Sequence, residues 1–478
     1  MLESTSRRPS FLVPQIPSAT AATGGNVAAW RREARALLAL SLPIAFSHLG
    51  QTLLGVVDTA VVGRVGELHL GAAGLGNALF FTVTVLGMGV MLGLDPVIAQ
   101  AMGAGEANKA RRALWQGVWL AGLVGVPLML VVLLASGTLE LMGIAPDSAV
   151  LTRAYVMARL PSLVPFLVFV ALRCYLQAAG TTRPVVTAVV LANIVNVPLS
   201  IVLVFGDEAL TRAGLPPLGL PALGVAGAGW ASTACTLVQV VVLADAMRRS
   251  SSAAEPNARQ VDAVVMKRAL LLGLPIGLQL VAEFGVFALV NVAMANLDST
   301  SLAAHQVALT LASATFMVPV GIGAATSVRV GRAIGQGDAT GTRRAGIVGL
   351  GLGTTFMIGS ALCFWLFPES LAAIITSDAK VIDAAVGLLL VAAVFQISDG
   401  VQAVGAGALR GAGDTRFTFL ANVAGHYLIG LPLGLVLTFV LAAGAPGLWW
   451  GLSAGLTVVA IALLRRFLRI SAGAIARV

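Results

Sequence analysis

Apolar runs recur along nearly the whole chain and are separated by short polar segments that are often basic. The runs are about twenty residues long, which is the length that an α-helix needs to cross the hydrocarbon core of a bilayer. Their polar residues lack the alternation of a membrane-barrel strand, so helices are favoured over a closed barrel. The pattern predicts an all-α polytopic membrane protein with twelve transmembrane helices, at residues 37–63, 71–101, 113–135, 155–178, 185–206, 222–247, 268–296, 301–328, 345–368, 381–408, 417–441 and 446–464.

Composition agrees with a fold whose solvent is lipid. The chain is 58% hydrophobic and 11% charged, against roughly 25% charged residues in a soluble domain. The net charge of +9 does not indicate a nucleic-acid partner, because the basic residues lie between the apolar runs and form no single aromatic-interleaved face. The three cysteines, Cys174, Cys235 and Cys363, are scattered within apolar segments, so neither a disulfide framework nor a metal cluster is expected.

The distribution of basic residues predicts the orientation of the chain. With the N-terminus in the cytoplasm, the cytoplasmic loops and tails hold 24 of the 30 Lys and Arg residues, and the opposite loops hold five. The positive-inside rule therefore predicts a multi-pass protein of the inner (plasma) membrane with both termini cytoplasmic. The remaining basic residue, Arg173, lies near the cytoplasmic end of the fourth span and is expected to snorkel to the surface.

The order of spans and polar segments predicts five regions. Residues 1–36 are expected to be a disordered cytoplasmic tail, since they are rich in Ser, Thr, Ala and Pro and contain no long apolar segment. An N-terminal six-helix lobe (37–247) and a C-terminal six-helix lobe (268–465) are joined by a polar cytoplasmic linker (248–267) and followed by a cytoplasmic tail (466–478).

An internal repeat relates the two halves. Leu42-Pro43-Ile44 recurs 232 residues later, and at the same offset AQAMGAGEANKARRA (99–113) falls on GRAIGQGDATGTRRA (331–345). With one residue of slippage, LQAAGTTR (176–183) matches LRGAGDTR (409–416). The offset moves six helices, an even number, so the halves share one orientation and form a parallel repeat about an axis along the membrane normal. This symmetry suits alternating access by rocking one lobe against the other.

Three carboxylates lie inside predicted spans: Asp58, Glu283 and Asp399. A charge at the bilayer centre costs roughly 2.5 to 3.5 kcal/mol on insertion scales, so such a group must face a cavity, form a pair or hold a proton. The repeat places Gln51 opposite Glu283 and no acid opposite the other two. Scaffold features are duplicated and these acids are not, so we expect them to exchange a proton or hold a monovalent cation such as Na⁺. Two further acids, Asp95 and Asp245, lie toward cytoplasmic ends, where a structural role is favoured.

Amides in the spans are candidates for supporting these acids. Asn193 and Asn196 precede Pro198, and Asn422 precedes Pro432. A proline within a helix frees a backbone carbonyl, so each segment could make an oxygen-rich pocket for a small cation, although interhelical hydrogen bonding remains an equal alternative. Further supporting candidates are Gln51, Gln279 and Gln306, and weaker ones are His305 and His426.

Catalytic and nucleotide-binding signatures are missing from the sequence. It contains no G-x-x-x-x-G-K-[ST] loop, no H-E-x-x-H motif and no nucleophile elbow. We therefore expect a secondary active transporter, not an enzyme, with no cofactor beyond the coupling ion.

The chain resembles the multidrug and toxic compound extrusion (MATE) family over residues 37–465. The resemblance is carried by VVDTAVVGR (56–64), LAAHQVAL (302–309) and QISDGVQAVGAGALRGAGDTR (396–416). It implies two six-helix lobes and cation-driven efflux, with Glu283 and Asp399 similar to the coupling acids of the NorM-type branch. It also implies that Asp58 is similar to the helix 1 aspartate of the N-terminal lobe, with Asn193 and Asn196 as its helix 5 partners. The sequence of helix 1 is more similar to the DinF-type branch than to typical NorM-type sequences.

The resulting hypothesis is a Na⁺- or H⁺-coupled antiporter, expected to be a monomer in the lipid bilayer, that exports small amphipathic and often cationic compounds. The alternative is a flippase for lipid-linked or oligosaccharide substrates, which predicts a cavity lined by Arg and Lys; the predicted spans contain almost no basic residues. A membrane enzyme or channel lacks a catalytic constellation or a filter-like segment. The sequence leaves the choice between Na⁺ and H⁺ open, as well as the lobe that carries the main cation site.

Overall fold

The protein is a bundle of long helices. The computed structural model describes residues 26–212, 214–249 and 259–478, which contain no strand and twelve helical spans long and apolar enough to cross a membrane. The elements are α1 (Asn26–Val62), α2 (Glu67–Leu92), α3 (Leu94–Gly103), α4 (Ala107–Gly137), α5 (Pro146–Arg159), η1 (Leu160–Ser162), α6 (Leu163–Ala178), α7 (Arg183–Phe205), α8 (Asp207–Arg212), α9 (Val225–Arg249), α10 (Ala263–Ala295), α11 (Ser299–Gln336), α12 (Ala339–Leu366), α13 (Pro368–Ile375), α14 (Ala379–Gly411), α15 (Thr415–Val423), η2 (Ala424–Gly430), α16 (Leu431–Leu435), η3 (Val436–Val440) and α17 (Ala445–Ile470).

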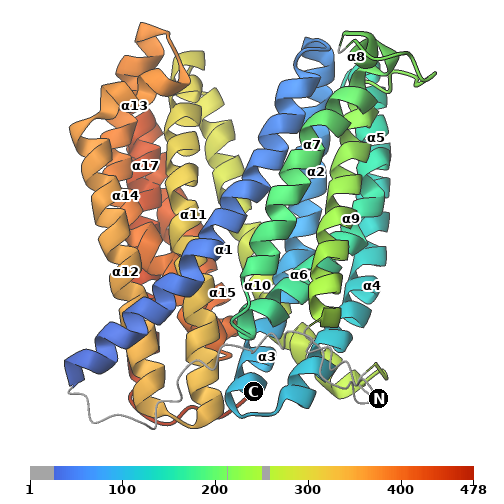
Figure 1. Ribbon diagram of the computed structural model, residues 1–478. Coiled ribbons are helices and arrows are strands. Elements are labelled where there is room, and N and C mark those ends of the chain that lie inside the picture. Colours follow the sequence, from blue (N-terminus) through green and yellow to red (C-terminus); the bar gives the residue numbers. More distant parts are fainter. Residues whose placement is uncertain (1–25, 213, 250–258) are drawn as a thin grey trace, which may run out of the picture.

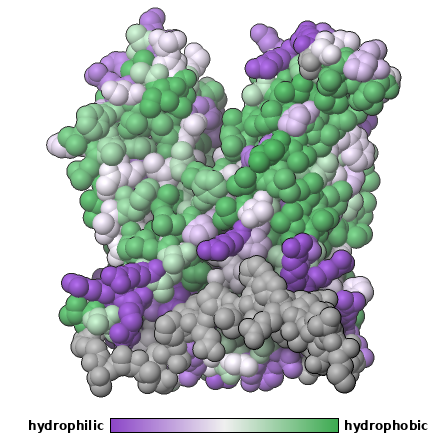
Figure 2. All heavy atoms as spheres, viewed as in Figure 1, coloured by the Kyte–Doolittle hydropathy of each residue, from purple (hydrophilic) through white to green (hydrophobic). Residues whose placement is uncertain are grey.

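The helices form the two predicted six-helix lobes. Elements α1 to α9 build the N-terminal lobe and α10 to α17 the C-terminal lobe (Figure 1). The lobes lie together at the end where α1 begins and where the chain ends, which we call the basic end, and they separate toward the opposite, open end. Figure 2 shows a hollow between the lobes at the open end and, on the face in view, a broad apolar band across both lobes, with hydrophilic residues below it and at the tips of the open end.

The predicted tails are shorter than expected. Helix α1 begins at Asn26, so residues 26–36 are helical and the expectation of a disordered tail reaching residue 36 is wrong; residues 1–25 lie outside the described part. Charged residues lower the mean hydropathy of this segment, yet Glu33 forms a partly buried ion pair with Arg329 of α11. Helix α17 likewise reaches Ile470, beyond the predicted start of the C-terminal tail.

The predicted linker also begins and ends in helix. Helix α9 reaches Arg249 and α10 starts at Ala263, while residues 250–258 lie outside the described part. Just before α10, the side chain of Gln116 in α4 donates to the carbonyl of Gln260 and accepts from the backbone N–H of Asp262.

Helices α1 and α10 each pack on both lobes. The predicted division into lobes at residues 37–247 and 268–465 did not include this crossing. Toward the basic end, Leu37, Leu40 and Ile44 of α1 form an apolar cluster with Ala325 of α11 in the C-terminal lobe. Toward the open end, α1 packs on α7 of its own lobe. Helix α10 mirrors this arrangement and packs its basic-end half on α2.

Glycine contacts close the basic end in a symmetric way. A Cβ atom added at Gly103 of α3 would overlap the carbonyl of Arg332 in α11, and one added at Gly335 of α11 would overlap the carbonyl of Gln100 in α3. Both pairs are related by the 232-residue offset of the repeat. Backbones of the two lobes therefore touch directly about the pseudo-two-fold axis, which leaves no room for any side chain.

We expect Gly335→Val to force α3 and α11 apart and to favour opening of the basic end. The expected result is a lengthened distance between spin labels at Lys109 and Arg343, exposed positions of opposite lobes, with transport reduced by about tenfold, which corresponds to overpacking of 1 to 2 kcal/mol. The matched control is Gly122→Val in α4, where an added Cβ meets no atom within 4 Å. An unchanged label distance in Gly335→Val would contradict the proposed closure.

Candidate functional site

Asp58 lies inside the N-terminal lobe, surrounded by hydrogen-bond donors. Its Oδ1 atom accepts from Asn196 Nδ2 at 2.9 Å and from Ser200 Oγ at 3.0 Å, both in α7, and its Oδ2 accepts from the hydroxyl of Ser232 in α9. The aspartate is 5% exposed. Three donors from two helices thus hold a carboxylate in the half of α1 toward the open end.

The amides predicted to accompany Asp58 separate into two groups. Asn196 contacts the acid, whereas Asn193 donates to the carbonyls of Gly50 and Val189 and does not reach it. Ser200 and Ser232 were missed by sequence reasoning. Ser200 stands one helical turn after Asn196, and this i, i+4 spacing is the only signal that could have indicated it.

Glu283 lies in the C-terminal lobe within a cluster of amides. Its Oε1 atom accepts from Gln279 Nε2 at 3.0 Å and from Gln402 Nε2 at 2.6 Å, and Gln402 also donates to Asn422 Oδ1 at 3.0 Å. The structure thus brings the predicted residues Gln279 and Asn422 together around the predicted acid. Gln402 was missed, although it follows Asp399 by three residues and so shares its helix face.

Asp399 stands one helical turn before Gln402, the residue that donates to Glu283, so both acids belong to the same polar cluster of the C-terminal lobe. Among the described residues, neither acid forms an ion pair with Lys, Arg or His, and none donates a hydrogen bond to Asp399. Two like charges in a low-dielectric region repel each other, and a proton or a monovalent cation between them removes that repulsion. The arrangement suits reversible uptake of one positive charge.

An irregular helix supports this cluster. After Val423 the eleventh span changes from α-helix to a π-helical segment, Ala424–Gly430, which ends two residues before Pro432. Proline supplies no N–H to the helical ladder, and π-helical turns often occur at functional sites. Within the segment, Tyr427 donates its hydroxyl to the carbonyl of Ala282, which fixes α10 next to Glu283.

The remaining polar candidates lie apart from the acids. Gln51 exchanges hydrogen bonds with Gln239 of α9, and Gln306 donates to Asn291 at 2.6 Å. His305 accepts from the indole N–H of Trp449. His426 contacts the carbonyl of Asn422 and so touches the Glu283 cluster only through the backbone. Of the two acids given a structural role, Asp245 pairs with the exposed Arg249 on its own helix and Asp95 pairs with Arg410 of the other lobe.

A cavity of about 160 Å³ lies between the lobes and contains Glu283, Gln279 and Gln402 in its wall. Arg173 also lines it, only 7% exposed, so the expectation that this arginine snorkels to the surface is wrong. Asp58 does not line this central cavity.

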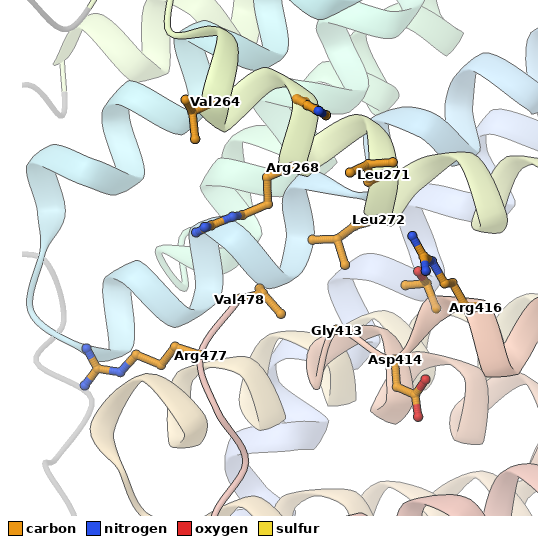
Figure 3. A pocket seen from close by; sticks show the side chains of 11 residues that line it. Val264, Arg268, Leu271, Leu272, Gly413, Asp414, Arg416, Arg477 and Val478 are labelled. Atoms are coloured by element: carbon orange, nitrogen blue, oxygen red, sulfur yellow. The ribbon is translucent and has the colours of Figure 1, made fainter.

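A second cavity, of about 470 Å³, lies at the basic end beside the start of α10 and the start of α15. In Figure 3, Arg268, Arg416 and Arg477 surround it together with Asp414. Asp414 is engaged in an ion pair with Arg466 at 2.7 Å. None of the predicted coupling acids reaches this cavity, so it is separate from the site around Glu283.

Comparisons with known proteins give one consistent result. The family model described as MatE matches residues 43–202 and again 275–436, two segments that begin 232 residues apart. The chain is 40% identical to the probable multidrug resistance protein NorM of Deinococcus radiodurans, covering 91% of this chain and 95% of the relative. It is 36% identical to the protein of the same name from Bradyrhizobium diazoefficiens, covering 90% and 92%. The fold is similar to the Vibrio cholerae MATE transporter VcmN in the bent form, with a TM-score of 0.82 at 18% identity, covering 93% of this chain and 98% of that chain.

Proposed function

The chain belongs to the multidrug and toxic compound extrusion (MATE) family, and from this premise we propose that it is a Na⁺- or H⁺-coupled antiporter exporting amphipathic, often cationic compounds. Relatives that cover nearly the whole chain carry the name of a multidrug resistance protein, which supports the substrate class. Two lobes in contact at one end and apart at the other suit alternating access about a central cavity (Figure 1).

In this proposal the basic end faces the cytoplasm. The excess of Lys and Arg at this end supports the assignment through the positive-inside rule. The hollow between the lobes then opens to the outside (Figure 2), so that the structure corresponds to the state that releases substrate and takes up the coupling ion.

The observation that carries the proposal is the position of Glu283 at the cavity wall, near Asp399 and without a basic partner among the described residues. A cation from outside that neutralises these acids weakens their attraction for a cationic compound and promotes its release. On the cytoplasmic side, loss of that cation restores the negative charge and substrate binds again. Competition of this kind is required, because a ligand shifts a conformational equilibrium only through differential affinity.

The flippase alternative receives less support from the same cavity. The predicted spans contain almost no basic residues, yet Arg173 and Arg410 both line the cavity, so the expectation of a cavity without basic side chains does not hold. However, Asp95 and Glu283 line the same cavity, and Arg410 is paired with Asp95. The four charges cancel, whereas a polyanionic headgroup requires a clear excess of positive charge.

Transport in proteoliposomes with imposed gradients tests this function. We expect a Na⁺ gradient or a pH gradient, applied separately, to drive movement of a cationic dye such as ethidium against its concentration, and collapse of that gradient to stop it. Liposomes without protein are the control. Failure of both gradients to drive transport of any cationic dye by folded protein would refute ion-coupled antiport.

A further inference from the structure

The central cavity contains an arginine without a partner. Arg173 and Gln177 stand one turn apart on α6, both line the cavity, and they are 7% and 4% exposed. Arg173 Nε and Gln177 Nε2 have no hydrogen-bond partner, and Arg173 forms no ion pair within 4 Å among the described residues. Both orphaned atoms are donors, so the group that would satisfy them is an acceptor.

The nearby acid is shared between two arginines. Asp95 interacts electrostatically with Arg173, but its Oδ2 atom is 3.2 Å from Nε of Arg410. Two arginines and one aspartate leave one positive charge at this side of the cavity. The ring of Phe169 lies 5.9 Å from the Arg173 guanidinium and offers only partial compensation. A desolvated and unpaired charge at membrane depth is costly, which marks it as a candidate for ligand contact.

The repeat shows that this side of the cavity is not part of the duplicated scaffold. In the register that aligns residues 176–183 with 409–416, Ala406 stands opposite Arg173 and Arg410 stands opposite Gln177. The unpaired arginine therefore occurs in one lobe only, as the acids Glu283 and Asp399 do in the other. The cavity is consequently bipolar, with an acid contributed by the C-terminal lobe and a free guanidinium by the N-terminal lobe.

We propose that Arg173 and Gln177 form a subsite for a carboxylate of the transported compound. The inference rests on the proposed antiport function and specifies its substrates: zwitterions bind with the cationic group toward Glu283 and the carboxylate toward Arg173. A guanidinium and an amide N–H can each donate to one carboxylate oxygen, a charge-assisted arrangement stronger than hydrogen bonds between neutral groups. Such a ligand supplies the acceptors that the orphaned donors lack.

A dye that exists as a free acid and as its methyl ester tests the subsite. A rhodamine carboxylic acid and its ester differ only in the group that Arg173 is proposed to bind, and fluorescence anisotropy measures their affinity for the full-length protein in detergent without requiring transport. We expect Arg173→Gln to raise the Kd of the acid by about tenfold or more, since hydrogen bonds to charged groups contribute 1.5 to 3 kcal/mol. The Kd of the ester should stay within about twofold, and Arg173→Lys should retain part of the affinity for the acid.

The controls separate this inference from the proposed function. Arg153→Gln removes a half-exposed arginine of α5 outside the cavity and should change neither Kd. An equal loss of affinity for acid and ester in Arg173→Gln would indicate a structural role and overturn the subsite, as would unchanged binding of both dyes. Failure of ion gradients to drive transport of the ester by the wild type would instead refute the antiport function and leave the binding result to be judged on its own.

Discussion

Replacement of Glu283 by Gln is expected to lower gradient-driven dye efflux by about a hundredfold while the protein stays folded, a change that corresponds to about 2.7 kcal/mol in the transport barrier. Glutamine keeps the size of the side chain, and its amide oxygen can still accept from Gln279 and Gln402. Only the capacity to carry a negative charge is lost. Uptake of the coupling ion and attraction of a cationic substrate both depend on that charge in the proposed cycle.

Dye efflux from proteoliposomes under imposed Na⁺ or pH gradients, normalised to the amount of folded protein, measures this effect. The matched control is Glu369→Gln, which alters an exposed glutamate in the first turn of α13 outside the spans and should transport like the wild type. Asp399→Asn should resemble Glu283→Gln, since the two acids act on each other. Wild-type efflux by both Glu283→Gln and Asp399→Asn would refute the proposed coupling.

The two lobes hold their acids in different ways. Asp58 receives three hydrogen bonds and is separate from the central cavity, whereas Glu283 receives two from glutamines and lies in the cavity wall. A fully satisfied carboxylate is already stabilised by fixed donors, so a substrate gains less by reaching it. We therefore expect direct competition between substrate and cation in the C-terminal lobe, with Asp58 acting on the conformation of α1 against α7 and α9.

The spans and the acids were predictable because each depends on one strong local signal. Twenty apolar residues suffice to indicate a span, and a carboxylate among them is energetically unusual wherever the helix faces. The residues that donate hydrogen bonds to these acids have no comparably strong signal in the sequence. Ser200 and Ser232 reach Asp58 across 142 and 174 residues of sequence, and serine within a membrane helix is common.

Errors in the prediction concern the direction and extent of helices. The charged start of α1 was assigned to a tail because its hydropathy is low. Hydropathy does not include the ion pair that Glu33 forms with Arg329 of the other lobe. Arg173 was expected at the membrane surface because its position along α6 is near the basic end, but its direction depends on how the helix is rotated in the bundle. The crossing of α1 and α10 between lobes likewise follows from packing and has no marker in either helix alone.

The ion pair between Asp95 and Arg410 joins the two lobes at the wall of the central cavity. Asp95 belongs to α3 and Arg410 to the last turn of α14, and their side chains are 4% and 16% exposed. If the basic end opens during transport, this pair must separate. The repeat places Ser327 opposite Asp95 and Gln177 opposite Arg410, so the symmetric position holds no second ion pair. We expect this pair to help hold the basic end closed, together with the ion pair of Glu33 with Arg329, which also joins the lobes at this end.

Arg410→Gln is expected to favour the conformation open at the basic end and to reduce efflux strongly, because it removes the ion pair that joins the lobes at the buried carboxylate of Asp95. Loss of one partner of a buried pair costs at most about 3 to 5 kcal/mol, and Arg173, which stays close to Asp95, belongs to the same lobe and does not replace the contact between the lobes. The double variant Asp95→Asn/Arg410→Gln removes both charges and should recover most of the closed population. Spin-label distances between positions 109 and 343 report that population, and dye efflux reports function. The control is Arg212→Gln, which breaks the exposed pair with Glu208 in α8 and should have little effect. If Arg410→Gln keeps the wild-type distance and efflux, or if the double variant is as impaired as the single one, the pair of Asp95 and Arg410 does not close the basic end. The glycine contacts between α3 and α11 and the ion pair of Glu33 with Arg329 must then hold it shut.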